Sequence, residues 1–213
     1  MHKEVTRSWP LFAGIGTMMI AHGLQMQLMG IRSVAENFSV ITTGIFMAGY
    51  FIGYFSGSQT TPKLVQKVGH IRVFAAFASL ASLSALLAAV YVNPVMWTLS
   101  RIITGISLVS CYIVAESWLN DRATNKNRGQ LLSAYMIILY IGLGIGMLLL
   151  NVSDPKNYEP FILVSVLLSL ALVPILLTKR PTPKFKKIGT ISIKELYKIS
   201  PLGAVSSFCT GLI

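Results

Sequence analysis

The chain has 213 residues, of which 54% are hydrophobic and only 12% are charged, and its formal net charge is +11. Soluble domains average about 25% charged residues, so this composition excludes an ordinary soluble globular protein. The long uncharged stretches do not alternate apolar and polar residues, which excludes a membrane β-barrel. We therefore predict an all-α membrane protein.

Six apolar stretches follow one another, and most approach the ~20 residues that a helix needs to cross a bilayer core. We predict membrane-spanning helices at residues 9–30, 41–61, 73–92, 95–117, 130–151 and 160–178. They form a six-helix bundle over residues 1–178, followed by a basic cytoplasmic segment at 179–200. Residues 201–213 begin another apolar segment that is too short to cross. We expect it to be the start of a seventh helix, and the chain to be the amino-terminal half of a longer protein.

Basic residues gather at every second gap between these stretches. Of the 18 lysines and arginines, all but Arg32, Arg101 and Lys156 lie before the first stretch, at 63–72, at 122–128 or after 178. The positive-inside rule then places the amino terminus in the cytoplasm. We expect the membrane to be the plasma membrane of a bacterium, that is, its inner membrane. A nucleic-acid-binding protein gathers its basic residues on one folded face, so we expect no nucleic-acid partner.

Polar residues are unevenly distributed among the six stretches. The first contains His22 and Gln25, the fourth contains Arg101 and Glu116, and the third and sixth are almost wholly apolar. Polar side chains in a bilayer usually face a cavity or a partner, so we predict that the first and fourth helices line a cavity.

The second and fifth stretches carry small-residue stripes, which let helix backbones approach closely. The predicted helix-packing glycines are Gly49, Gly53, Gly57, Gly142 and Gly146. The third and sixth stretches are predicted to face lipid. Because the same order of roles occurs twice, we predict two three-helix inverted repeats.

Two local motifs resemble the major facilitator superfamily (MFS). Residues 62–72 are similar to its loop motif Gly-x-x-x-Asp-Arg-x-Gly-Arg-Lys, where Lys67, Gly69 and Arg72 fit or nearly fit and Gln66 replaces the aspartate. The segment 101–105, Arg-Ile-Ile-Thr-Gly, matches the family's Arg-x-x-x-Gly pattern.

A third motif and two further runs extend this resemblance to the whole chain. Gly142 and Gly146 resemble part of the antiporter glycine motif, although Ser133 and Met147 depart from it. The runs at 115–120 and 127–132 resemble a narrower branch, the uncharacterised MFS-type transporters of the YcaD kind. The resemblance implies two six-helix halves, with helices 1 and 4 lining the cavity and helices 2 and 5 packing against the other half. It implies transport but no particular substrate.

Two interpretations of Arg101 remain. Its guanidinium either reaches the lipid headgroups, or it is a cavity cation that binds an anionic group or controls a proton site. Arg101, Tyr112 and Glu116 lie on one helical face, because positions 101, 105, 108, 112 and 116 follow one another at intervals of three or four residues. Glu116 is either a proton-titrating carboxylate or a cytoplasmic latch that pairs with a basic residue, for which Lys67, Arg72 and Arg128 are the candidates. Gly69 belongs to the same gating motif.

The first helix carries a second polar face, formed by His22, Gln25, Met26 and Met29. His22 is either a proton shuttle or an uncharged hydrogen-bonding group between helices. Gln25 and Met29 are candidate substrate contacts, together with Tyr112 of the fourth helix.

These features predict a secondary active transporter of an unidentified small solute, working by alternating access and coupled to a proton or ion. The sequence has no nucleotide-binding phosphate loop, no His-Glu-x-x-His and no paired intramembrane aspartates, so we expect no enzyme, cofactor or metal site. The expected partners are the solute, the coupling ion, the lipid bilayer and the remaining half of the chain. The alternative is a six-helix membrane scaffold or a channel-like protein without coupled transport.

Overall fold

The computed structural model describes residues 8–152, 154–177, 197–203 and 205, and no strand occurs among them. The chain divides into two compact units, Met1–Pro183 and Lys184–Ile213. In the second unit, residues 197–199 and 201–203 are helical. The rest of the predicted basic segment and of the predicted seventh helix lies outside the described residues.

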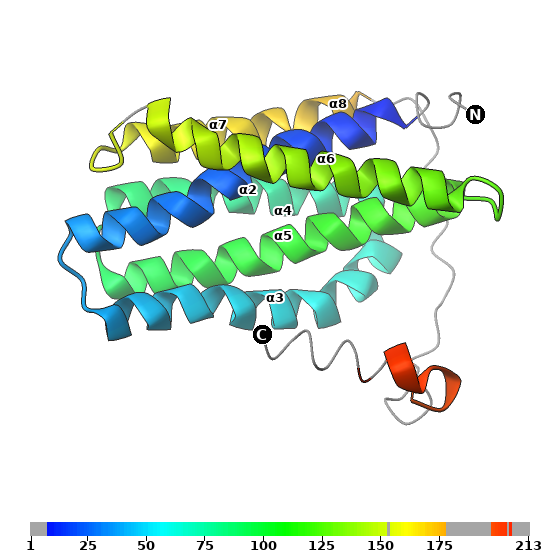
Figure 1. Cartoon of the computed structure of the whole chain (residues 1–213), viewed down its shortest axis with the longest axis horizontal. Helices are drawn as coiled ribbons and strands as arrows, with labels where there is room; N and C mark the ends of the chain where they lie inside the picture. Colours follow the sequence, from blue (N-terminus) through cyan, green and yellow to red (C-terminus); the bar gives the residue numbers. More distant parts are fainter. Residues whose placement is uncertain (1–7, 153, 178–196, 204, 206–213) are drawn as a thin grey trace. The chain divides into compact units, whose positions relative to one another are not determined.

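The first unit is a bundle of long helices (Figure 1). In chain order these are α2 (Trp9–Ala35), α3 (Val40–Val68), α4 (His70–Val90), α5 (Pro94–Arg122), α6 (Arg128–Leu149), the short 3-10 helix η1 (Leu150–Val152), α7 (Glu159–Leu170) and α8 (Leu172–Leu176). Five segments are long and apolar enough to cross a membrane, namely α3, α4, α5, α6 with η1, and α7 with α8. Six were predicted. The first helix, α2, has 27 residues but carries polar side chains along its middle and is not among the five.

Helix boundaries follow from capping residues and prolines. The Ser39 hydroxyl accepts a hydrogen bond from the Thr42 amide at 3.1 Å at the start of α3, and the Asn93 side chain accepts one from the Val95 amide at 2.8 Å at the start of α5. Such side chains satisfy amides that have no partner within the helix. Pro174 lies inside the short helix α8. It removes a backbone donor and its ring clashes with the carbonyl four residues earlier, that of Leu170, where α7 ends.

The predicted loop at 62–72 is instead almost wholly helical. The helix α3 continues through Pro62 to Val68, and Gly69 alone separates it from α4. Gly69 has φ +88°, a conformation that glycine adopts at no steric cost, so a one-residue junction is possible here. Pro62 lies inside α3, whose last turns bend away from the line of the helix (Figure 1).

Helices far apart in the sequence make most of the packing contacts. The helix α3 packs against α5, α2 packs against α6, α7 and α8, and α4 packs against α5 and α7. In their most apolar windows only 22% of the residues of α3 and of α6 are buried, against 44% for α4 and 39% for α7 with α8. Within this unit, the third and sixth helices (α4, and α7 with α8) are thus more buried than α3 and α6. Their contact with lipid stays a prediction. A wholly apolar helix packs as well against another apolar helix as against lipid, so its composition does not distinguish the two.

The predicted packing glycines are buried and lie at helix crossings. A Cβ atom added to Gly53 would meet the carbonyl group of Ile102 on α5, and one added to Gly105 would meet the carbonyl of Tyr50 on α3. On α6, a Cβ atom at Gly146 would meet the carbonyl of Ile20 on α2. Both crossings depend on the absence of a side chain.

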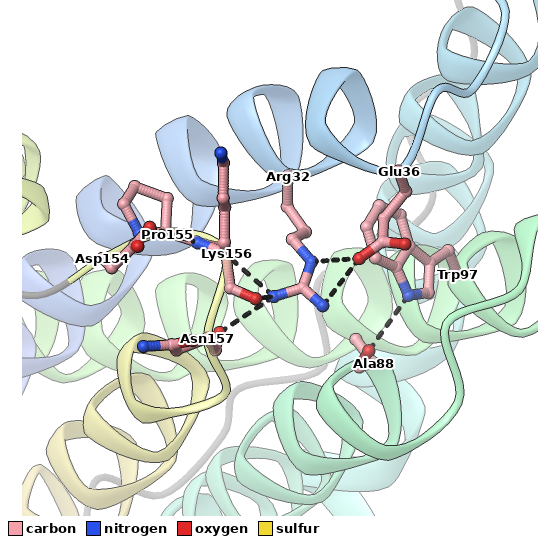
Figure 2. A network of polar contacts seen from close by, with 8 residues as sticks. All are labelled: Arg32, Glu36, Ala88, Trp97, Asp154, Pro155, Lys156 and Asn157. Carbon is pink, nitrogen blue, oxygen red and sulfur yellow. Dashed lines mark hydrogen bonds and ion pairs between the residues drawn. The ribbon is translucent and has the colours of Figure 1, made fainter.

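Arg32 ties the end of α2 to the loop before α7 (Figure 2). Its Nη2 forms an ion pair with Glu36 at 2.7 Å, and its Nε donates to the same carboxylate at 2.7 Å. Its Nη1 lies against three carbonyls, those of Pro155 at 3.4 Å, Asn157 at 3.1 Å and Lys156. Nothing in the sequence pattern predicts this role of Arg32, because its partners are backbone carbonyls, which every type of residue has.

We expect Arg32→Gln to loosen this loop. Loss of the partly exposed ion pair and of the carbonyl bonds removes about 1–2 kcal/mol of local stability. The backbone amides of Lys156 and Asn157, which donate to Asp154, should then exchange roughly tenfold faster in hydrogen–deuterium exchange. Lys156→Gln is the matched control, because only the carbonyl of Lys156 contacts Arg32 and its side chain is exposed. Equal protection in wild type and Arg32→Gln would contradict the role.

Candidate functional site

A buried polar cluster lies where α2, α3 and α5 meet. The guanidinium carbon of Arg101 on α5 lies 4.8 Å from the ring centroid of Tyr50 on α3. The imidazole of His22 on α2 stacks on the same tyrosine, with centroids 5.7 Å apart and ring planes at 21°. Three helices thus bring a cation, a phenol and an imidazole together.

The glycines of the α3–α5 crossing position this cluster. Gly105 lies one turn after Arg101, and any side chain there would collide with the backbone of Tyr50. Its absence lets α3 approach α5, which leaves the Tyr50 ring within cation–π distance of Arg101.

Several polar atoms of this region lack hydrogen-bond partners among the described residues. Arg101 is 3% exposed, Gln25 1% and His22 6%. Nε and Nη1 of Arg101, Nε2 of Gln25 and Nδ1 of His22 are buried without a partner. Buried polar groups are nearly always paired, and each unpaired one costs roughly 1–3 kcal/mol. Such a group in a membrane protein points to a function.

The other predicted residues of α5 lie farther along the helix from Arg101. The Tyr112 hydroxyl donates to the Met19 thioether sulfur at 3.0 Å. The Tyr135 hydroxyl on α6 donates to the Glu116 carboxylate at 3.4 Å. At 1.5 Å per residue, these positions lie about 16 Å and about 22 Å along the helix from Arg101.

The predicted latch between Glu116 and the basic gap residues is not formed in this conformation. Lys67, Arg72 and Arg128 are exposed. Within the part of the chain that the structure describes, Glu116 has Tyr135 as its hydrogen-bond donor and forms no ion pair. The latch stays a prediction.

Met29, predicted as a substrate contact, lies in an apolar cluster at the far end of α2. It is fully buried beside Phe46 and Trp97. Conversely, Tyr50 is the central residue of the polar cluster. The sequence alone marks Tyr50, like Tyr140, as a residue that can face the cavity, but it does not fix the orientation of the side chain.

A pocket of about 470 Å³ lies elsewhere, near the network of Arg32. Its lining residues are Ile31, Leu150, Asn151, Val152, Asp154 and Pro155. None of the buried unpartnered atoms of the described residues belongs to that lining. The cluster around Arg101 is therefore the stronger candidate site.

Comparison with known proteins gives one consistent family. The model of the Major Facilitator Superfamily matches residues 11–213. The chain is 24% identical over 205 residues to the "Uncharacterized MFS-type transporter YcaD" of Escherichia fergusonii, covering 95% of this chain and 54% of that protein. It is 25% identical over 207 residues to the protein of the same name from Escherichia coli O6:K15:H31, with the same coverage. The chain spans about half the length of these curated relatives.

Proposed function

Because this chain belongs to the Major Facilitator Superfamily, we propose that it forms half of a secondary active transporter that moves a small solute by alternating access. The resemblance predicted from the motifs is confirmed, and the chain is an integral multi-pass membrane protein. The family points to transport rather than catalysis. In this proposal a second six-helix half completes the cavity.

One observation carries the proposal most directly, the buried polar cluster of His22, Tyr50 and Arg101. Its side chains come from three helices of a predominantly apolar bundle. Ionisable groups at membrane depth are costly, and they usually mark a substrate or ion pathway. Burial of the Arg101 guanidinium favours a cavity cation over one that reaches the headgroups, because a headgroup contact requires exposure.

The packing pattern supports two three-helix inverted repeats. In such an arrangement α2 corresponds to α5, α3 corresponds to α6, and α4 corresponds to α7 with α8. Under this correspondence each main contacting pair of helices matches another contacting pair or itself. The α3–α5 pair becomes α6–α2, and both crossings contain glycines. The α4–α7 pair maps onto itself, and there Ser82 and Ser165 share a hydrogen bond of 2.7 Å between their hydroxyls. In the proposed mechanism, two rigid six-helix halves, each built from such repeats, rock about a central site.

The distribution of charge supports a cytoplasmic amino terminus in a bacterial inner membrane. Arg122 at the end of α5 donates to the Ser8 hydroxyl before α2 at 3.4 Å. His70 at the start of α4 shares a hydrogen bond of 3.0 Å with Ser117. These contacts bring the basic residues of 63–72 and 122–128 to one end of the bundle, which the positive-inside rule assigns to the cytoplasm.

Proteoliposomes containing the complete protein test the proposal. A pH-sensitive dye inside the vesicles reports proton movement when solutes from a chemically varied panel are added across an imposed proton gradient. A proton- or ion-coupled transporter gives saturable, concentrative uptake of at least one solute. A channel gives flux without accumulation, and a six-helix scaffold gives none. Either of the last two results overturns the proposal.

Glu116 is our candidate for coupling. We expect Glu116→Gln to reduce concentrative uptake at least tenfold while solute exchange without a gradient persists, because the amide cannot carry a proton. The matched control is Glu159→Gln, which removes an exposed carboxylate at the start of α7. Unchanged accumulation in Glu116→Gln would remove this residue from the coupling mechanism.

A further inference from the structure

Arg101 lacks a counter-charge in the described part of the chain. The ion pair present there joins Arg32 to Glu36. Glu116, on the same helix as Arg101, lies about 22 Å along the axis and accepts a hydrogen bond from Tyr135. Arg101 as a whole residue is 3% exposed. A buried guanidinium without a counter-charge is strongly unfavourable, because burial removes its hydration without returning an opposite charge.

The contact with Tyr50 leaves the hydrogen-bonding edge of the guanidinium free. The Arg101 guanidinium carbon lies over the tyrosine ring, and a cation–π contact of this kind uses no N–H group. The N–H groups of a guanidinium project from its edge, and they fit carboxylate and phosphate oxygens. Nε and Nη1 of Arg101 have no such partner in the described residues.

The neighbouring unpartnered atoms are also nitrogens. Gln25 offers an amide nitrogen, a hydrogen-bond donor, and His22 offers a ring nitrogen from the same face of α2. No carboxylate or carbonyl oxygen occurs among the buried unpartnered side-chain atoms of the described residues. The N–H donors of Arg101 and Gln25 beside a fixed positive charge select a ligand that is rich in acceptors and negatively charged.

We propose that the transported solute carries an oxyanion, a carboxylate, phosphate or sulfonate group, and that this group binds Arg101 at the junction of α2, α3 and α5. Tyr50 holds the guanidinium by its face, and Gln25 donates a further hydrogen bond to the oxyanion. This inference rests on the proposed transporter function and names the substrate class of the same site.

Thermal unfolding of the complete protein in detergent tests this binding. The probes are matched pairs of acid anion and neutral amide, namely acetate and acetamide, benzoate and benzamide, succinate and succinamide, with inorganic phosphate and methanesulfonate added. We expect at least one anion to raise the Tm by about 3 °C or more, and by clearly more than any neutral compound. Arg101→Gln should abolish this shift, whereas Lys126→Gln, which removes an exposed charge, should retain it. Equal shifts for anions and amides, a retained shift in Arg101→Gln, or no stabilising anion overturns the proposal.

A second arm needs no ligand. Arg101→Met replaces an unpaired buried cation by an apolar side chain, so we expect the unliganded protein to have a higher Tm than wild type. A lower Tm would reveal an internal partner for Arg101 and overturn the inference.

Two further comparisons separate the possible failures. Phosphatidylglycerol, and no soluble anion, could raise the Tm of wild type but not of Arg101→Gln. The oxyanion would then belong to a lipid, and the proposal that it belongs to the transported solute would be overturned. Saturable transport of a neutral or cationic solute that Arg101→Gln leaves unchanged would keep the transporter function and overturn the anion site. Anion binding without any transport would keep the site and overturn the function.

Discussion

Gly53→Ala is expected to destabilise the bundle by about 2–3 kcal/mol, and Gly53→Leu to prevent its assembly. The added Cβ would meet the carbonyl oxygen of Ile102 and would lie 2.8 Å from its carbonyl carbon and 3.0 Å from its Cα. These are backbone atoms of a facing helix, so no side chain can rotate away. The two helices must separate, and α3 then loses packing along the crossing. The midpoint of SDS-induced unfolding, followed by circular dichroism, measures the effect.

Gly44 provides a control within the same helix. A Cβ added there meets nothing within 4 Å, and alanine is a better helix former than glycine by about 1 kcal/mol. Gly44→Ala should therefore leave the midpoint unchanged or raise it. Similar losses in the two variants would show that the close crossing at Gly53 is not what limits stability.

Trp97→Ala is expected to cost about 3 kcal/mol by leaving a cavity at the end of the bundle where α5 begins. The indole is fully buried. Its ring centroid lies 5.2 Å from that of Phe38 and 5.3 Å from that of Phe46, both in edge-to-face contacts. Its N–H group donates to the Ala88 carbonyl at 3.0 Å (Figure 2). Lipid is as apolar as this interior, so transfer from water contributes little, but the lost packing contacts are not replaced.

Two variants separate packing from hydrogen bonding in this cluster. Trp97→Phe keeps an aromatic ring but removes the N–H donor, and should cost about 1 kcal/mol. Trp9→Ala removes a tryptophan that is 61% exposed and should cost less than Trp97→Ala. If Trp97→Ala and Trp9→Ala unfold at the same SDS concentration, the buried cluster makes no special contribution to stability.

Patterns of residue type predicted much of this architecture. The apolar stretches located the ends of the long helices to within seven residues, since hydropathy reports on a property that each helix carries alone. The stripe of Gly49, Gly53 and Gly57 marked the face of α3 that lies against α5. The resemblance to the superfamily, built from short motifs, is supported by the match over residues 11–213.

Features that depend on two segments at once escaped prediction. Arg32 binds backbone carbonyls more than a hundred residues away, and any residue type offers such a carbonyl. Tyr50 joins the Arg101 cluster through the direction of its own side chain beside the α3–α5 crossing, which the glycine stripe alone does not specify. The stretch 62–72 read as a loop because it contains a proline and charged residues, yet α3 accommodates Pro62 by bending.

The partners of α2 have a consequence for the order in which the protein is made. The helix that carries His22 and Gln25 packs mainly against α6, α7 and α8, the nearest of which begins at Arg128. At 5–20 residues per second, synthesis of the intervening chain takes about 5–20 s. During that interval α2 lacks most of the helices against which it packs. Tyr50 and Arg101 belong to helices that are made earlier, but the packing that holds His22 and Gln25 in place forms only when α6, α7 and α8 arrive. Completion of the proposed solute site is therefore a late event in biogenesis.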